Sequence, residues 1–295
     1  MIKEQIDIDI LKERMATKVS DVWRVGGWQL TSGGVFSAYS AEAFLVVGSP
    51  NVLIDCGSHL TYDELLRNLS VIGVRPEDIG LVLATHSHGD HIGAAAKLKE
   101  VYGIPFAIHP GDAGEAEQGF HDALSPAVFT PPVAVDSLIH DGQEFQVGDR
   151  TFSIYHLPGH SPGSVCIGTQ SVDGPRLMFV GDVVHGIFSA KAIEERGESI
   201  FELMLKWADG LERVRNLDFD YMFEGHVFPF MENLSLMDED EQHNFVGRLL
   251  SEMDSRRKGA ENGKELIDTR IFLLRQGFLH LPDYYISEDC LTAGK

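Results

Sequence analysis

Short apolar runs separated by polar turns dominate the chain between about residue 20 and residue 110. Five of these runs are the length of strands, and the first three are closed by turns rich in Gly, Ser, Pro or Asn. The predicted strands are residues 22–25, 43–47, 51–55, 81–84 and 106–109. Two further stretches, residues 61–72 and about 91–102, predict helices; in the first, Leu65, Leu66 and Leu69 recur on one helical face.

A second strand-rich block follows a stretch from about 111 to 141, whose Ala, Gly, Pro and acidic residues predict helix and loop at the surface. The predicted strands of this block are residues 144–147, 151–156, 164–168, 177–182 and 221–223. An amphipathic helix over 199–216 separates the last two strands, and further helices are predicted at about 242–257 and near 267–276. Two strand-rich blocks, each flanked by helices, predict an α/β protein of the α+β type, with sheet packed on sheet and helices outside.

The composition fits a globular protein and argues against two classes of binding partner. Of the 295 residues, 43% are hydrophobic, and the mean hydropathy is −0.06, values that allow a substantial core. The formal charge is −21, from 45 acidic and 24 basic residues. Such a surface repels phosphate backbones and anionic lipid. We therefore expect neither a nucleic-acid partner nor a membrane partner.

Cysteine usage and the N-terminus predict a cytoplasmic location. Cys56, Cys166 and Cys290 are odd in number and form no CxxC pair, which fits a reducing compartment better than a disulfide framework. The first residues alternate charged and apolar side chains and have no signal-peptide core. No apolar run approaches the length of a membrane-spanning helix.

The residues after the strand at 81–84 carry the clearest chemistry in the chain. His86, His88, Asp90 and His91 form the pattern HxHxDH. His86 and His88 are two apart, so in an extended segment they point the same way, while Gly89 lets the chain turn sharply. Asp90 and His91 then lie at the start of a helix. His and Asp are costly to bury together unless a metal coordinates them, and four ligands are too many for one tetrahedral ion with an open position.

Three later segments place further metal-ligand residues just after strand-like runs, each with Gly nearby. They are His160, Asp182 after Gly181, and His226 after Gly225. Each alone is more typical of an ordinary polar turn. Together with HxHxDH they indicate one metal centre assembled from several strand ends.

With these motifs in order, the chain resembles the metallo-β-lactamase superfamily, the αββα-fold metallohydrolases. The five motifs of that superfamily match Asp55 in LIDCG, then HxHxDH, then His160, Asp182 and His226. The similarity covers about residues 20 to 230. It implies a four-layer αββα sandwich with added C-terminal helices.

The resemblance also implies a ligand set. His86, His88 and His160 would bind one ion, Asp90, His91 and His226 a second ion, and Asp182 would bridge them. Asp55 would support the site from behind through a hydrogen bond to a ligand imidazole. The two divalent ions are expected to be Zn²⁺, although Fe and Mn also suit mixed nitrogen and oxygen ligands.

The function implied is a dinuclear metal-dependent hydrolase of a small-molecule ester, thioester or lactone. A hydroxide held between the ions would be the nucleophile, and Asp90 would be the catalytic residue that orients it and shuttles its proton. Asp182 argues against native β-lactam hydrolysis, because β-lactamases of the superfamily typically lack an Asp ligand there. Two alternatives stay open: a mononuclear iron enzyme resembling persulfide dioxygenases, and a signalling effector that retains its metal and acts through its C-terminal helices.

Substrate contacts and domain roles are less constrained by the sequence. The segment after Asp182 departs from the glutathione-binding pattern of glyoxalase II, and His185, Phe188 and Phe228 are candidate substrate-binding residues. For the two aromatic residues, packing of the C-terminal helices onto the core is the favoured alternative, and His185 could equally have a supporting or surface role. We predict a catalytic domain over 1–226 and a helical extension over 227–295 on the same domain. The extension could be a lid, a homodimer contact or a partner-binding surface.

Overall fold

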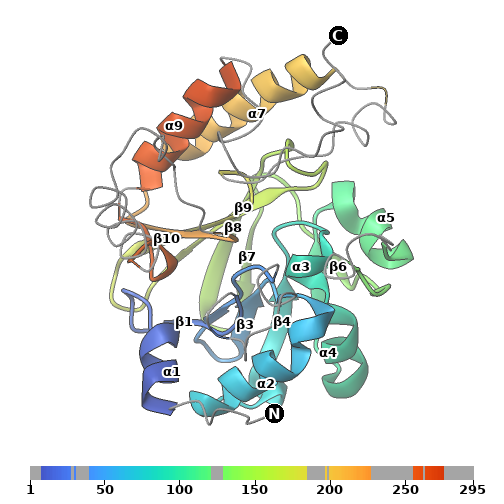
Figure 1. Cartoon of the computed structure of the whole chain (residues 1–295), viewed down its shortest axis with the longest axis vertical. Coiled ribbons are helices and arrows are strands. Elements are labelled where there is room, and N and C mark those ends of the chain that lie inside the picture. The colour runs from blue at the N-terminus through green and yellow to red at the C-terminus, as the bar shows by residue number, and fades with distance from the viewer. Residues whose placement is uncertain are drawn as a thin grey trace, which may run out of the picture.

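The structure is a computed structural model that describes residues 8–27, 30, 40–120, 129–184, 197, 199–226, 255–261 and 263–275. Two sheets form its centre (Figure 1). The first has the order β1-β2-β3-β4-β5-β6, with strands Val22–Arg24, Phe44–Val46, Asn51–Ile54, Ile79–Leu83, Phe106–Ile108 and Ser137–Leu138. The second has the order β11-β10-β9-β8-β7, with β7 Glu144–Val147, β8 Arg150–His156, β9 Val165–Gln170, β10 Arg176–Gly181 and β11 Tyr221–Glu224.

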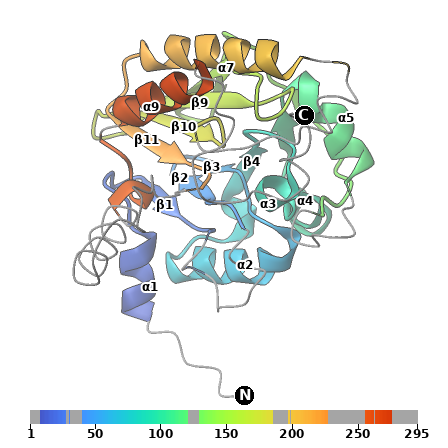
Figure 2. The same ribbon diagram turned by 45° about the horizontal axis from the view of Figure 1, so that its top comes forward.

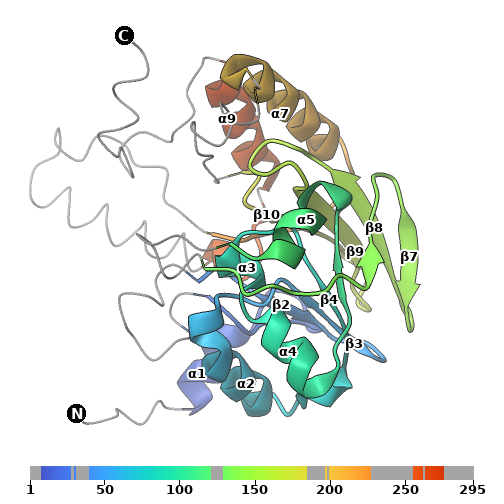
Figure 3. The same cartoon turned by 90° about the vertical axis from the view of Figure 1, so that its right-hand side faces the viewer.

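The helices lie on the two outer faces. Those beside the first sheet are α1 Ile8–Met15, α2 Tyr62–Val71, α3 Gly89–Ile92, α4 Ala95–Tyr102 and α5 Pro110–Gln118, with the short 3₁₀ turns η2 His59–Thr61 and η3 Pro76–Asp78. The second sheet is covered by α7 Ile200–Arg215 and α9 Gly263–Arg275. Figure 3 shows α7 and α9 on one side of the paired sheets and α1, α2 and α4 on the other. This arrangement confirms the predicted αββα sandwich.

Alternation along the central strands explains the layers. In β4, Val82 packs toward the helices of the first sheet, whereas Leu81 and Leu83 face the second sheet. In β10, Phe179 faces the first sheet, and Met178 packs toward α7 and α9. Because side chains alternate between the two faces of a strand, sheets buried on both faces need apolar residues at successive positions. The short uninterrupted apolar runs in the sequence are therefore central strands.

The observed elements differ from the predicted ones in several places. β6, Ser137–Leu138, lies within the stretch predicted as helix and loop. The predicted helix at 91–102 is split into α3 and α4, because the backbone carbonyl of His91 accepts a hydrogen bond from Cys56 N at 2.7 Å. The first helix, α1, was not predicted; Leu11 and Met15 anchor it. The last predicted helix begins earlier than expected, at Gly263.

Most of the predicted helix at 242–257 lies outside the described residues, apart from a helical turn at 255–257. The division into domains 1–226 and 227–295 stays a prediction. Among the described helices none combines the length and the apolar character needed to cross a membrane.

Candidate metal centre

The predicted ligands lie at one edge of the two sheets because of strand direction. β4 runs parallel to β3 and β5, and β10 runs parallel to β11. His86 follows β4, Asp182 follows β10, and His226 follows β11, so all three emerge from carboxyl ends of strands. His160 comes from the loop between β8 and β9. The structure therefore brings together residues that are 140 positions apart in the sequence, from 86 to 226.

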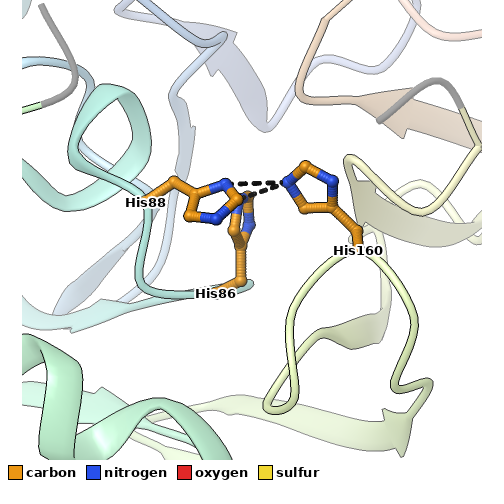
Figure 4. A group of neighbouring side chains, drawn as sticks. All are labelled: His86, His88 and His160. Atoms are coloured by element: carbon orange, nitrogen blue, oxygen red, sulfur yellow. Dashed lines mark hydrogen bonds between the residues drawn. The ribbon is translucent and has the colours of Figure 1, made fainter. Parts of the chain in front are cut away.

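Three histidines form the first group of candidate metal ligands. His160 Nε2 lies 2.8 Å from His88 Nδ1 and 3.2 Å from His86 Nε2. Figure 4 shows the three rings converging on one point from two different loops. His86 and His160 are buried. Three imidazole nitrogens this close together match the donor set of a zinc-type site.

Asp90, His91 and His226 form the second group. His226 Nε2 lies 2.8 Å from Asp90 Oδ2, and His91 Nε2 lies 3.8 Å from the same oxygen. Asp90 and His91 belong to the single turn of α3, whereas His226 follows β11. The ligand atoms of each group lie within 4.8 Å of one another, which is close enough to hold an ion.

Asp182 lies between the two groups. Its Oδ1 is 3.2 Å from His91 Nε2, and its Oδ2 is 3.5 Å from His160 Nε2 and 3.7 Å from His226 Nε2. With His86 and His91 it forms a third set of converging ligand atoms. Asp182 Oδ1 and His91 Nε2 are buried, and within the described part of the chain they make no hydrogen bond, since their 3.2 Å contact with each other lacks hydrogen-bond geometry. Buried polar atoms without hydrogen bonds are costly, so this donor set fits bound metal.

The electrostatics divide the centre into two halves. Burial lowers the pKa of His86 well below its ordinary value, and burial with the nearby His88 lowers the pKa of His160 to about 3. These imidazoles are therefore neutral and available as ligands at neutral pH. In the other half, burial opposes ionisation, but the carboxylates of Asp182 and Asp90 raise the pKa values of His91 and His226.

The same interactions act on the carboxylate of Asp182. Burial opposes the charge on Asp182, but the imidazoles of His226, His91 and His160 lower its pKa well below the ordinary value. The pKa of Asp90 is lowered in the same way, against burial, by His91 and His226. Both carboxylates are ionised, which is the form that binds a cation.

Asp55 lies behind the clustered side chains, and its carboxylate contacts His91 directly and His86 through Thr85. Its Oδ2 accepts hydrogen bonds from His91 Nδ1 at 2.8 Å and Thr85 Oγ1 at 2.7 Å, and its Oδ1 accepts from Thr85 N at 2.8 Å. Because His91 donates its Nδ1 proton to Asp55, its Nε2 is directed at Asp182. Thr85 Oγ1 also lies 3.1 Å from His86 Nδ1. One carboxylate thus orients ligands of both groups.

Asp112 is a site residue that the sequence did not reveal. It lies in the first turn of α5 and is buried. Its Oδ2 accepts from Ser87 N at 3.0 Å and Ser161 Oγ at 2.6 Å, and its Oδ1 accepts from Gly163 N at 2.6 Å. Ser87 stands between two ligand histidines and Ser161 follows a third. Asp112 therefore ties together the two loops that carry the three-histidine group.

Gly225 is required by the close approach of the strand ends. A Cβ at this position would lie 2.6 Å from both Asp182 Oδ1 and His91 Cε1. No side chain fits there without displacing a ligand, which explains the glycine before His226. The candidate substrate-binding residues His185, Phe188 and Phe228 lie outside the described residues, so their roles stay predictions.

Comparison with known proteins agrees with this geometry. The model of the family described as the metallo-beta-lactamase superfamily matches residues 39–226. A probable metallo-hydrolase of Methanocaldococcus jannaschii is 30% identical over 192 residues, 64% of this chain and 88% of that protein. An acyl-coenzyme A thioesterase of Gallus gallus is 31% identical over 173 residues, 50% of this chain and 59% of that protein.

Among solved structures, a metallo-beta-lactamase from Cronobacter sakazakii carrying substitutions in its HARLDQ motif superposes with a TM-score of 0.65. It is 22% identical, and the match covers 94% of this chain and 96% of that one. At this identity the likeness shows a shared fold. Several curated relatives are longer than their match: the chain spans 53% of an Aquifex aeolicus protein and 59% of the thioesterase.

Proposed function

Since this chain belongs to the metallo-beta-lactamase superfamily, a family of metal-dependent hydrolases, we propose that it hydrolyses a small-molecule ester, thioester or lactone. The proposal includes two divalent ions, most simply Zn²⁺, held by the seven clustered side chains. The position of Asp182, within 3.2–3.7 Å of histidines from both ligand groups, is the observation that carries it. A carboxylate placed between two sets of ligands suits a bridge between two ions.

The residues have distinct roles in this proposal. His86, His88 and His160 would hold one ion, and Asp90, His91 and His226 the other, with Asp182 shared. When bound, such ions supply Lewis acidity and a water that ionises near neutral pH. Asp90 is the group that would orient the attacking water and accept its proton, because its Oδ2 faces the centre beside His226.

A thioester is the substrate class that the comparisons favour within this proposal. The Gallus gallus relative is named an acyl-coenzyme A thioesterase. We therefore rank thioesters first, with oxygen esters and lactones as the alternatives to be compared directly.

The test combines metal counting with a substrate panel. Purified protein would be analysed for its elements and assayed on matched acyl thioesters, oxygen esters, lactones and a β-lactam. We expect about two zinc ions per chain and turnover of an ester-type bond. In Asp182→Asn and His88→Ala, metal content and turnover should fall together, because each change removes a ligand.

Two outcomes would overturn the proposal. The first is full activity in either variant with metal below one equivalent. The second is a single iron per chain with consumption of oxygen, the behaviour of a mononuclear iron enzyme. Retention of hydrolysis with the β-lactam as the preferred substrate would keep the mechanism and replace the substrate class.

A further inference from the structure

Buried ion pairs join a segment beyond the family match to the edge of the metal centre. Arg256 donates to Glu224 through two bonds, Nε to Oε1 at 3.1 Å and Nη2 to Oε2 at 2.8 Å. Glu224 is 1% exposed and Arg256 6% exposed. Glu224 ends β11 and precedes the ligand His226 by two residues. Arg256 therefore binds the end of β11, two residues before His226.

The neighbouring arginine reaches a second buried carboxylate. Arg257 Nε lies 3.5 Å from Glu42 Oε1, and Glu42 Oε2 also accepts from Arg24 Nε at 2.9 Å and Nη2 at 2.8 Å. A Cβ at Gly27 would lie 2.3 Å from Glu42 Oε2. Glycine at this position leaves the space that the carboxylate needs. Glu42 is thus held between arginines from the N-terminal and C-terminal parts of the chain. Figure 2 shows the short orange-red turn at 255–257 near β1 and α1.

Residues 41 and 42 contact both segments that hold the second ligand group, α3 and the end of β11. Ala41 N donates to the backbone oxygen of Asp90 at 3.1 Å, and Glu42 N donates to that of Gly225 at 2.7 Å. The side chains of Asp90 and of His226, the residue after Gly225, meet with Oδ2 and Nε2 at 2.8 Å. The segment at 41–42, whose Glu42 side chain contacts Arg24 and Arg257, therefore links α3 to the end of β11. The three-histidine loops depend instead on Asp112.

We propose that Arg256 and Arg257 are positioning residues for the ligand group of Asp90, His91 and His226. Buried ion pairs contribute little net stability after desolvation, but they can fix one geometry. Both arginines lie beyond residue 226, where the family match ends, so a part of the chain outside the matched region completes one half of the centre. The inference rests on the proposed function, because it assumes that this group binds an ion.

The test measures the two zinc affinities separately by competition with a chromophoric chelator. In Arg256→Met, the second zinc should bind about 10- to 100-fold more weakly, the range for loss of a residue that orients a ligand. The first zinc should keep its affinity. Arg256→Lys restores the charge and should recover part of the loss. Arg215→Met is the matched control, because Arg215 pairs with Asp268 at an exposed site on α7 and α9.

The ¹⁵N shifts of the His226 imidazole in the metal-free protein give a second readout. They should change in Arg256→Met and stay unchanged in Arg215→Met. Wild-type affinities and shifts in Arg256→Met, or an equal loss of both zinc affinities, would overturn the inference. If the wild-type protein binds a single ion, the dinuclear proposal fails, and the His226 shifts alone decide the role of Arg256.

Discussion

A buried carboxylate that accepts several backbone hydrogen bonds can hold loops that are distant in sequence. Asp112 does so for the loops of Ser87 and Ser161. Asp55 accepts from the backbone and side chain of Thr85 and from the side chain of His91, at least 30 positions further along the chain. Neither carboxylate belongs to the clustered ligand atoms. Their effect on the centre is exerted through the orientation of its histidines.

We predict that Asp112→Asn weakens zinc binding at the three-histidine position by about 10- to 100-fold. An amide can accept at one end only, so at least one of the contacts to Ser87, Ser161 and Gly163 is lost. Zinc competition with a chelator measures the change. Glu117→Gln, on the exposed side of the same helix, should bind zinc as the wild type does. Equal zinc affinities in the two variants would contradict the prediction.

Some residues of the candidate site could be predicted from the sequence and others could not, for a physical reason. HxHxDH could be recognised because four potential metal ligands within six positions are uncommon outside a metal site. Asp112 could not, because a single Asp in the first turn of a helix is an ordinary N-terminal residue that favours the helix dipole. Its role depends on the approach of the 160–163 loop, and local sequence carries no information about that contact.

At the scale of elements, a group of buried hydrogen bonds near the start of β1 joins the two sheets. Asp21 precedes β1 and accepts from Arg150 at the start of β8, from Ser171 Oγ at 2.5 Å and from Val172 N at 2.9 Å. Arg150 also donates to the backbone oxygen of Val47 at 3.0 Å. A buried acid and base from different sheets therefore fix how the sheets meet.

This clamp predicts a pH-dependent contribution to stability. Burial opposes ionisation of Asp21, but Ser171, Val172 and Arg150 together lower its pKa below the ordinary value. The unfolded chain then takes up the proton first as the pH falls. The contribution is complete at neutral pH and is lost below about pH 4, as the pH passes through the lowered pKa of the folded state.

Asp21→Asn should lower the free energy of unfolding by about 1.5–3 kcal/mol at pH 7, the range for hydrogen bonds to a charged group. The difference from the wild type should shrink toward pH 3.5. Urea unfolding across this pH range measures both quantities. Asp209→Asn, at a site 74% exposed, should change stability by less than about 0.5 kcal/mol. A pH-independent difference for Asp21→Asn would contradict the assignment.

Helix and strand positions could be predicted because each sheet buries both faces and leaves short apolar runs in the sequence. Where tertiary contacts override local periodicity, the prediction was wrong. The turn of α3 ends because Cys56 N takes the carbonyl of His91, and that bond displaces the helical one. The 91–102 region has helical spacing throughout, so its local pattern does not reveal the break.

At the scale of the whole molecule, the described residues beyond the family match, 255–261 and 263–275, pack into the sandwich. Ile267 and Leu274 of α9 are fully buried and pack with Trp207 and Leu211 of α7 over the second sheet. Trp207 also donates from Nε1 to the backbone oxygen of Val183 at 2.9 Å, next to Asp182. Helix α7 therefore contacts the chain next to a candidate metal ligand.

We predict that a chain ending at His226 does not fold cooperatively. The truncation removes Ile267, Ile271 and Leu274 from the core and Arg256 from Glu224. At about 1.5–3 kcal/mol for each large apolar side chain, the loss approaches the total stability of about 5–15 kcal/mol typical of a domain. Urea titration followed by near-ultraviolet circular dichroism measures it. An unfolding midpoint equal to that of the full chain would contradict the prediction.

If the truncated chain does not fold, a different variant is needed to tell whether residues 227–295 form a lid, a dimer contact or a partner-binding surface. Loss of fold and loss of a lid would look alike in an assay of the truncated chain. A chain that keeps α9 and the Arg256–Glu224 pair preserves the buried contacts, so its substrate range and its oligomeric state report on the rest of the extension. If such a chain hydrolyses bulky and small thioesters in the same ratio as the full chain, the lid interpretation is wrong.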